Sequence, residues 1–115
     1  MKQDQSILRV GQVIGIKPEC ISEYRRLHAE TWPEIRSLLS QCNIRNYSIF
    51  LKEPENLLFA YMEYTGSSWK EDMKKMAEDT AMKRWWLLTD PMQVPLETRG
   101  PNEWWAGMDM VFFNG

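Results

Sequence analysis

The stretch that decides the fold is residues 44–65, IRNYSIFLKEPENLLFAYMEYT. Residues 44–52 alternate in polarity, as a strand does when one of its faces is buried. One face of this strand carries Tyr47, Ile49 and Leu51, and the other carries Ile44, Asn46, Ser48 and Phe50. Residues 53–56 have turn chemistry, and residues 57–65 form a second apolar run. The stretch therefore predicts an antiparallel hairpin.

The residues before this hairpin predict one more strand and two helical segments. Residues 6–16 are rich in valine and isoleucine, which favours a strand, and the Lys-Pro step after them is a typical helix start. From Pro18 the apolar side chains recur at steps of three and four residues, which indicates an amphipathic helix that ends near Ala29. Residues 31–34, TWPE, have the form of a capping box and predict a second segment to about Ser40.

The residues after the hairpin predict two further helical segments and a last strand. A serine at position 67 or 68 can cap a helix over residues 69–78, and a second segment follows over about 80–88. Residues 93–103 are rich in proline, glycine and polar side chains, which indicates an exposed loop. Residues 103–113 then predict the last strand.

These elements follow each other in the order β-α-β-β-α-β, which is the split βαβ pattern of ferredoxin-like α+β domains. Such a domain has one antiparallel sheet with helices on one face, and residues 1–115 suffice for a single domain of this kind. The other face of the sheet stays uncovered in a chain with six tryptophans and four tyrosines. We therefore expect a homodimer that encloses a cavity between the sheet and the partner.

Composition and charge exclude several classes of partner. The formal net charge of -2 at pH 7 offers no attraction to phosphates, so we do not expect nucleic acid as a partner. The longest apolar run, residues 57–62, is far shorter than the roughly 20 residues of a membrane span, and the N-terminus lacks the pattern of a secretion signal. Cys20 and Cys42 lie outside any metal-ligand spacing, and no phosphate-binding loop is present. We expect no metal, no cofactor and a cytoplasmic location.

His28 is the only histidine of the chain and the first candidate for chemistry. Tyr24 precedes it by four residues, so the two side chains lie one helical turn apart on one face, where a single site can use both. A histidine in this position also fits a simpler role, in which it is half buried and hydrogen-bonded to a neighbour. The spacing leaves both interpretations open.

Other aromatic residues raise the same question. Trp85 and Trp86 are helical neighbours that point about 100° apart, so one ring can belong to the core while the other lines a site. Packing of both rings between helix and sheet is the simpler alternative. Trp104 and Trp105 would face opposite sides of a strand, one in the core and one at a subunit contact. Tyr47 lies on an otherwise aliphatic strand face, where a buried hydroxyl needs a partner.

Four blocks of the chain resemble the L-rhamnose mutarotase family, in their order and at their separations. They are YRRLHAETWPEI (24–35), NYSIFL (46–51), LLFAYMEY (57–64) and RWWLLTDPM (84–92). The resemblance covers roughly residues 7–113 and implies a dimeric α+β barrel that interconverts the α and β anomers of a free monosaccharide without a cofactor. It further implies that the proton-donating residue is His28 and that the sugar is bound by Tyr24, Tyr47, Trp85 and Trp86.

The C-terminus departs from the family pattern. Related chains usually have an acidic residue before a Val-Phe pair, whereas Met110 stands in that place here. A contact to the site from this end is therefore not carried over from the resemblance. A variant ending is consistent with a different 6-deoxy sugar as substrate.

Mutarotation opens the hemiacetal ring, turns the C1 carbonyl over and closes the ring on the other face. Opening delivers one proton to the ring oxygen and removes one from the anomeric hydroxyl, which is acid–base chemistry that histidine performs near neutral pH. His28 fits the donor role, while a tyrosine hydroxyl, a carboxylate or a water could take the anomeric proton. An alternative function on the same architecture is a small-molecule oxygenase or ligand-binding module, with His28 as a ligand or steering group.

Overall fold

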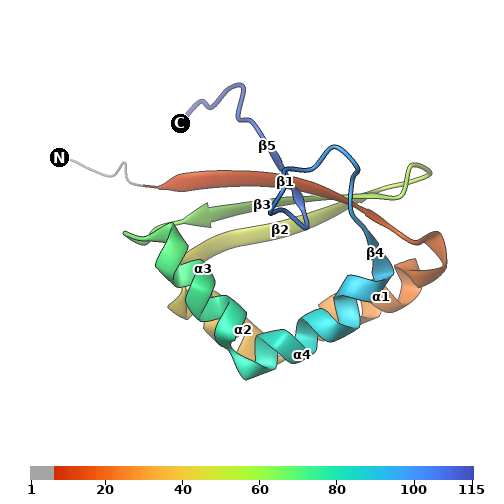
Figure 1. Cartoon of the computed structure of the whole chain (residues 1–115), viewed down its shortest axis with the longest axis horizontal. Helices are drawn as coiled ribbons and strands as arrows, with labels where there is room; N and C mark the ends of the chain where they lie inside the picture. Colours follow the sequence, from red (N-terminus) through yellow and green to blue (C-terminus); the bar gives the residue numbers. More distant parts are fainter. Residues whose placement is uncertain (1–6) are drawn as a thin grey trace.

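The structure is a computed structural model that describes residues 7–115. Within this range a curled antiparallel sheet forms one layer and four helices form the other (Figure 1). The helices are α1 (Ile21–Ala29), α2 (Pro33–Gln41), α3 (Trp69–Glu78) and α4 (Thr80–Thr89), with 3-10 turns η1 (Pro18–Cys20) and η2 (Asp90–Met92). The strands are β1 (Leu8–Ile16), β2 (Ile44–Lys52), β3 (Leu57–Tyr64), β4 (Gln93–Val94) and β5 (Ala106–Met108).

The sheet has the strand order β2-β3-β1-β4, and all of its pairings are antiparallel. β5 also pairs with β1, so that β4 and β5 lie one after the other along the β1 edge that β3 leaves open. This order confirms the predicted ferredoxin-like α+β arrangement, with the hairpin of residues 44–65 on the other side of β1. Within the described residues, every helix is too short or too polar to cross a bilayer.

A β-bulge in β2 corrects the predicted facing of Ile44. Arg45 pairs with Glu63 and Ser48 with Tyr61, so two residues of β2 lie opposite one residue of β3. Asn46, one of these two, has a φ of 52°, a backbone conformation that asparagine tolerates better than most residues. The extra residue shifts the alternation by one, so Ile44 faces the helices and is only 4 % exposed. Strict alternation from residue 44 to 52 was therefore the wrong prediction for Ile44.

The predicted capping box at residues 31–34 does not form. Trp32 is the N-cap residue of α2 and has no side-chain capping bond, because an indole only donates and cannot accept from the backbone N–H groups of the first turn. The hydroxyl of Thr31 instead donates to the carbonyl of His28, at 2.7 Å, and so closes the end of α1. The expected start of the first strand, at Ser6, lies outside the described residues.

The C-terminal part departs most from the sequence prediction. The expected loop over residues 93–103 contains the short strand β4, and the expected strand over residues 103–113 is paired only at Ala106–Met108. Glu103 explains part of this difference, since its Oε1 accepts hydrogen bonds from the backbone N–H groups of Gly100 and Gly107, at 2.8 and 3.2 Å. These bonds hold residues 100–107 in a tight turn. Beyond β5 the chain runs away from the sheet (Figure 1).

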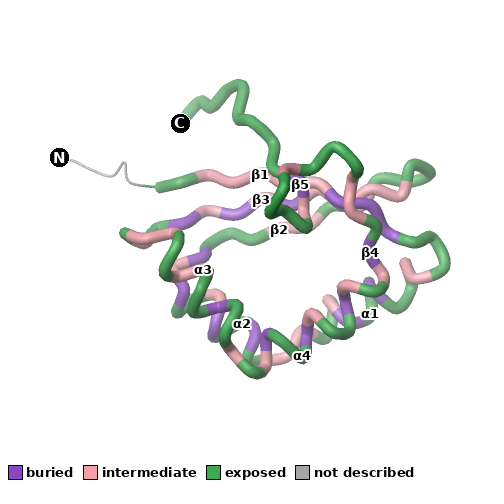
Figure 2. Tube along the Cα trace, viewed as in Figure 1, coloured by how far each residue is buried: buried purple, intermediate pink, exposed green. Residues whose placement is uncertain are grey.

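Two clusters of buried side chains hold the helices against the sheet, and Figure 2 shows buried positions in both layers. The larger cluster joins α2 and α4 to β2 and β3 through residues such as Ile35, Leu38 and Met82. The smaller cluster contains Ile14, Ile16, Tyr24 and Leu58. Each cluster contributes side chains to a pocket between the layers.

Candidate active site

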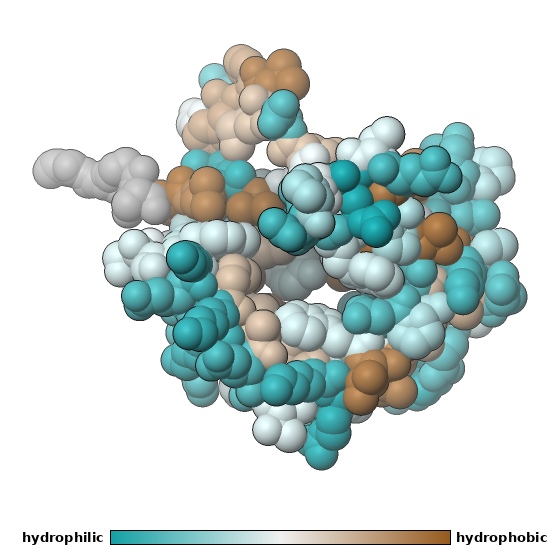
Figure 3. Space-filling view, viewed as in Figure 1, coloured by the Kyte–Doolittle hydropathy of each residue, from teal (hydrophilic) through white to brown (hydrophobic). Residues whose placement is uncertain are grey.

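A pocket of about 910 Å³ lies between the helices and the curled face of the sheet, and Figure 3 shows the hollow between the two layers. Its polar lining residues are Gln12, Tyr24, Arg25, His28, Thr31, Arg36 and Tyr47. Among the described residues that line it there is no aspartate or glutamate. The wall therefore offers hydrogen-bonding groups and aromatic surface, and it offers no carboxylate as a general base.

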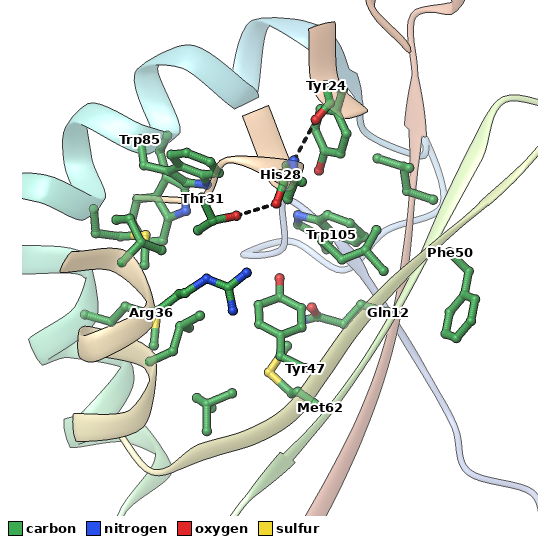
Figure 4. Close-up of a pocket in the computed structure, with 18 of the residues that line it drawn as sticks. Gln12, Tyr24, His28, Thr31, Arg36, Tyr47, Phe50, Met62, Trp85 and Trp105 are labelled. Atoms are coloured by element: carbon green, nitrogen blue, oxygen red, sulfur yellow. Dashed lines mark hydrogen bonds between the residues drawn. The ribbon is translucent and has the colours of Figure 1, made fainter. Parts of the chain in front are cut away.

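His28 lies in the wall of this pocket, on the same face of α1 as Tyr24, as the four-residue spacing predicts (Figure 4). The two rings are stacked, with centroids 4.3 Å apart and planes inclined by 29°. Trp85 meets the His28 ring edge-on at a centroid distance of 5.3 Å. These contacts hold the imidazole in one orientation, with aromatic rings on two sides.

The hydrogen bond of Nδ1 determines the tautomer of His28. Nδ1 lies 2.9 Å from the backbone carbonyl oxygen of Tyr24. A carbonyl oxygen can only accept, so Nδ1 carries the proton, and Nε2 of the neutral ring keeps its lone pair. Burial lowers the pKa of His28 below its ordinary value of 6.5, and the bond to Tyr24 opposes this shift only in part. At neutral pH the imidazole is therefore mostly uncharged, with Nε2 as an acceptor.

Tyr24 is almost fully buried, with 5 % of its surface exposed, yet it lines the pocket. Its hydroxyl oxygen accepts a hydrogen bond from Nε2 of Gln93 at 3.0 Å. Burial raises the pKa of Tyr24 well above its ordinary value, so the hydroxyl keeps its proton at any physiological pH. The hydroxyl thus keeps a proton that it can donate, while its oxygen already accepts one hydrogen bond.

Tyr47 reaches the pocket from the opposite wall, because it is the second of the two residues in the β2 bulge and points between the layers (Figure 4). Its surface remains 39 % exposed, since the pocket is open on that side. The surrounding walls nevertheless raise the pKa of Tyr47 to about 12 through burial of the hydroxyl. Phe50, three residues later, points to the outer side of the sheet (Figure 4) and is 63 % exposed.

The two tryptophans of α4 differ in burial, as expected for neighbouring helical residues whose side chains point about 100° apart. Trp85 is 6 % exposed and belongs to the larger buried cluster, where it meets Trp32 edge-on at 5.1 Å. Trp86 is partly buried and packs against the same cluster. Both nevertheless line the pocket, so the expected division into one core ring and one site ring is less sharp than the sequence suggested.

Sequence reasoning missed several residues of the pocket wall. Trp105 lines the pocket beside His28 (Figure 4), although it was expected in the core or at a subunit contact. Gln12 of β1 and Arg36 of α2 also point toward the cavity (Figure 4). Little in the sequence indicated these residues, because the face that a polar side chain occupies is known only once the register of its strand or the orientation of its helix is known. Met110, by contrast, does not line the pocket.

The site combines a neutral histidine, protonated tyrosines and several indole rings in a space suited to a small ligand. Among residues 7–115, no cluster of three histidine, cysteine, aspartate or glutamate side chains could hold a metal ion. Hydrogen-bonding groups beside flat apolar rings match the hydroxyls and the C–H face of an uncharged sugar. Fold and site together define the class as a small ferredoxin-like α+β protein with a small-ligand pocket that is lined by a histidine, two tyrosines and several indole rings.

Comparison with known proteins identifies the family within this class. The family model for L-rhamnose mutarotase matches residues 9–113, so the chain belongs to the L-rhamnose mutarotase family. An L-rhamnose mutarotase of Lactiplantibacillus plantarum is 33 % identical over 95 residues, which cover 83 % of this chain and 88 % of the relative. One of Mesorhizobium japonicum is 38 % identical over 96 residues, covering 72 % and 86 %.

A solved structure supports the fold assignment. The crystal structure of an L-rhamnose mutarotase from Formosa agariphila superposes with a TM-score of 0.74 at 23 % sequence identity. The match covers 94 % of this chain and 99 % of that one. The family predicted from the four sequence blocks and the α+β fold are both confirmed.

Proposed function

We propose that the protein is a carbohydrate isomerase that interconverts the α and β anomers of L-rhamnose or a related 6-deoxy sugar. The observation that carries this proposal is the stacked Tyr24–His28 pair in the wall of a sugar-sized pocket. Membership in the L-rhamnose mutarotase family supports the choice of sugar. A methyl group in place of a hydroxyl suits a wall rich in methionine, isoleucine and indole side chains, because it leaves no polar atom unpaired.

We assign the proton transfer to His28, in the acceptor role during ring opening and not in the donor role that the resemblance implies, because Nε2 of the neutral ring has no proton to donate. In ring opening, the neutral imidazole accepts the proton of the anomeric hydroxyl at Nε2, a donor supplies a proton to the ring oxygen, and the bond between C1 and the ring oxygen breaks. After the C1 carbonyl turns over, the released hydroxyl attacks C1 and returns its proton to that donor. The imidazolium of His28 then donates its proton to the new anomeric oxygen. Each group ends the cycle as it began.

Four residues hold the sugar in this proposal, as the family resemblance implies. Tyr24 and Tyr47 form hydrogen bonds to sugar hydroxyls or to the ring oxygen from opposite walls of the pocket. Trp85 and Trp86 offer flat apolar surface to the C–H face of the ring. Because Trp85 already holds His28 edge-on, the sugar and the imidazole share one aromatic wall.

Saturation-transfer NMR on L-rhamnose tests the function. Irradiation of one anomeric signal should reduce the other in the presence of the protein, in proportion to its concentration. L-Fucose and D-glucose, measured in the same way, would rank the sugars, because they differ from rhamnose in hydroxyl stereochemistry or in the methyl group. Exchange no faster than in protein-free buffer for all three sugars would contradict the proposal.

We also propose that the enzyme is a cytoplasmic homodimer. The dimer is supported by exposed apolar residues beyond the sheet, where Val111 is 95 % and Phe112 is 80 % exposed. Figure 3 shows hydrophobic side chains, in brown, in the segment that stands above the sheet. Free thiols at Cys20 and Cys42 suit a reducing compartment.

A further inference from the structure

Two residues outside the proposed site, Gln93 and Trp104, connect the C-terminal part of the chain to Tyr24. The indole nitrogen of Trp104 donates to Oε1 of Gln93 at 2.7 Å, and Nε2 of Gln93 donates to the hydroxyl oxygen of Tyr24 at 3.0 Å. Gln93 is the first residue of β4, is only 7 % exposed, and pairs with Ile16 of β1. Tyr24 is equally buried, so the amide and the hydroxyl have little access to water.

The direction of these hydrogen bonds follows from the indole N–H of Trp104. An indole nitrogen can only donate, so the amide oxygen of Gln93 must face Trp104. The amide nitrogen then faces Tyr24, and because it can only donate, the Tyr24 oxygen must accept. The hydroxyl proton of Tyr24 is left to point elsewhere. In Figure 4 the hydroxyl end of Tyr24 is directed toward the cavity, between His28 and Trp105.

We propose that Gln93, oriented by Trp104, is a positioning residue that makes Tyr24 a hydrogen-bond donor into the pocket. This inference rests on the proposed mutarotase function and specifies the polarity of its site. Tyr24 then presents a donor, while Nε2 of the stacked His28 presents an acceptor. A hemiacetal offers the complementary pair on one carbon, because its ring oxygen only accepts and its anomeric hydroxyl can donate. The arrangement selects sugars in the cyclic hemiacetal form and supplies the donor that ring opening requires.

The substitution Gln93→Glu tests this polarity with little change of shape. One oxygen of the introduced carboxylate can still accept from Trp104, but the other now accepts the hydroxyl proton of Tyr24 instead of donating to its oxygen. The bond is reversed and the pocket loses its donor. We expect kcat/KM for anomer exchange to fall roughly ten- to a hundredfold at neutral pH, the usual effect of losing one buried hydrogen bond.

Acidification provides the readout that a purely structural role would not move. A protonated carboxyl at position 93 can again donate to Tyr24, so the ratio of variant to wild-type rate should rise as the pH falls. Tyr24, His28 of α1, Tyr47 of β2 and Asp90 of η2 are the titratable groups around this hydroxyl. All are present in both proteins, and the ratio is compared over the pH range in which His28 is neutral in both, so that protonation of His28 does not contribute to it. A ratio that does not change with pH, or a wild-type rate at neutral pH, would overturn the inference.

Two further variants distinguish a failure of the Trp104–Gln93–Tyr24 hydrogen-bond network from a failure of the proposed function. Gln93→Leu leaves the Tyr24 proton free to reach the pocket, so it should exchange anomers faster than Gln93→Glu at neutral pH, and the reverse order would contradict the inference. The ¹⁵N indole resonance of Trp104, assigned with Trp104→Phe, should shift in Gln93→Leu whether or not the protein is active. An unchanged resonance overturns the network, whereas absence of exchange in the wild type alone overturns the proposed function. Thermal midpoints of all variants control for folding.

Discussion

His28 acquires its chemistry from one backbone atom. The carbonyl of Tyr24 holds Nδ1–H, which leaves Nε2 as the acceptor, and burial keeps the ring neutral. A histidine with the same spacing but a different Nδ1 partner would present the opposite polarity to the pocket. At the scale of the residue, the tautomer therefore matters as much as the residue type.

Replacement of His28 by alanine should slow anomer exchange by roughly 10²- to 10⁴-fold, the usual range for losing a general acid or base. The fold should survive, because alanine is a good helix former and the deletion enlarges a cavity that already exists. Exchange rate by NMR and the thermal midpoint are measured on the same preparation. A folded His28→Ala protein with an unchanged rate would remove His28 from the mechanism.

The matched control is Tyr24→Phe, which keeps the ring that stacks on His28 and removes only the hydroxyl. It leaves the amide nitrogen of Gln93 without its acceptor, so we expect a loss of about 1–3 kcal/mol, shared between stability and sugar binding. Its effect on the exchange rate should be smaller than that of His28→Ala. The opposite ranking would assign the main proton transfer to the hydroxyl.

The lowered pKa of His28 predicts the pH dependence of the rate. Exchange should stay constant through neutral pH and fall only on the acid side of the ordinary histidine value of 6.5, as Nε2 becomes protonated. Stability should change in the same direction, because below that value the unfolded chain binds a proton that the folded chain resists. The rate of exchange from pH 4.5 to 8 measures this. A rate that rises on acidification would show that the protonated form is the active one.

At the scale of the element, α4 combines packing and binding in neighbouring residues. Trp85 joins the buried cluster and also touches His28, whereas Trp86 is only partly buried. A helix turns by about 100° per residue, so two adjacent large rings cannot share one environment. The bulge of β2 has a comparable effect on the other wall, since it sets Ile44 and Tyr47 on the helix side of the sheet.

Trp85→Ala should therefore lower the free energy of unfolding by about 3–5 kcal/mol, as expected when a core tryptophan is truncated. Trp86→Ala should cost less stability and mainly weaken sugar binding. Urea denaturation gives the first quantity, and the dependence of exchange rate on rhamnose concentration gives the second. If both variants were as stable as the wild type and bound the sugar normally, neither ring would belong to the core or to the site.

At the scale of the whole molecule, the C-terminal residues 110–113 form a continuous run of exposed apolar side chains. Val111 and Phe112 lie beyond the last paired strand with nearly all of their surface open to solvent. Such a segment is costly to leave in water unless another surface covers it. In the proposed dimer, a second copy of the chain covers this segment.

Light scattering at micromolar concentration should give the mass of two chains. Phe112→Asp should shift the mass toward one chain, because it places a charge where apolar contact is expected. Leu87→Asp is the matched control, since Leu87 is 75 % exposed on α4 and lies outside the C-terminal segment. A wild-type mass of one chain, or an equal effect of both variants, would contradict the proposed interface.

Activity should also survive dialysis against EDTA. The proposed cycle consists of proton transfers between the sugar and side chains, and no residue in it needs a metal ion for its role. Anomer exchange is compared before and after dialysis, and again after Mg²⁺ or Zn²⁺ is added. A loss of anomer exchange on dialysis that either ion restores would show that the reaction needs a metal ion.

The local pattern of the sequence determined most of the fold. The hairpin, the helix over residues 69–78 and the placement of Tyr24 and His28 on one face all follow from periodicity and turn residues, which act over a few positions. The four sequence blocks also led to the family. These features depend on neighbours along the chain, so they can be predicted without the tertiary structure.

Only the tertiary structure decided the bulge, the division of the last strand and the chemistry of the pocket wall. The bulge at Asn46 depends on how β2 pairs with β3, and Trp105 lines the site from within the turn that the Glu103 hydrogen bonds close before β5. Gln93 meets Tyr24 across 69 positions of sequence. Such contacts form when distant segments pack together, and the hydrogen-bond direction they impose appears in no local pattern.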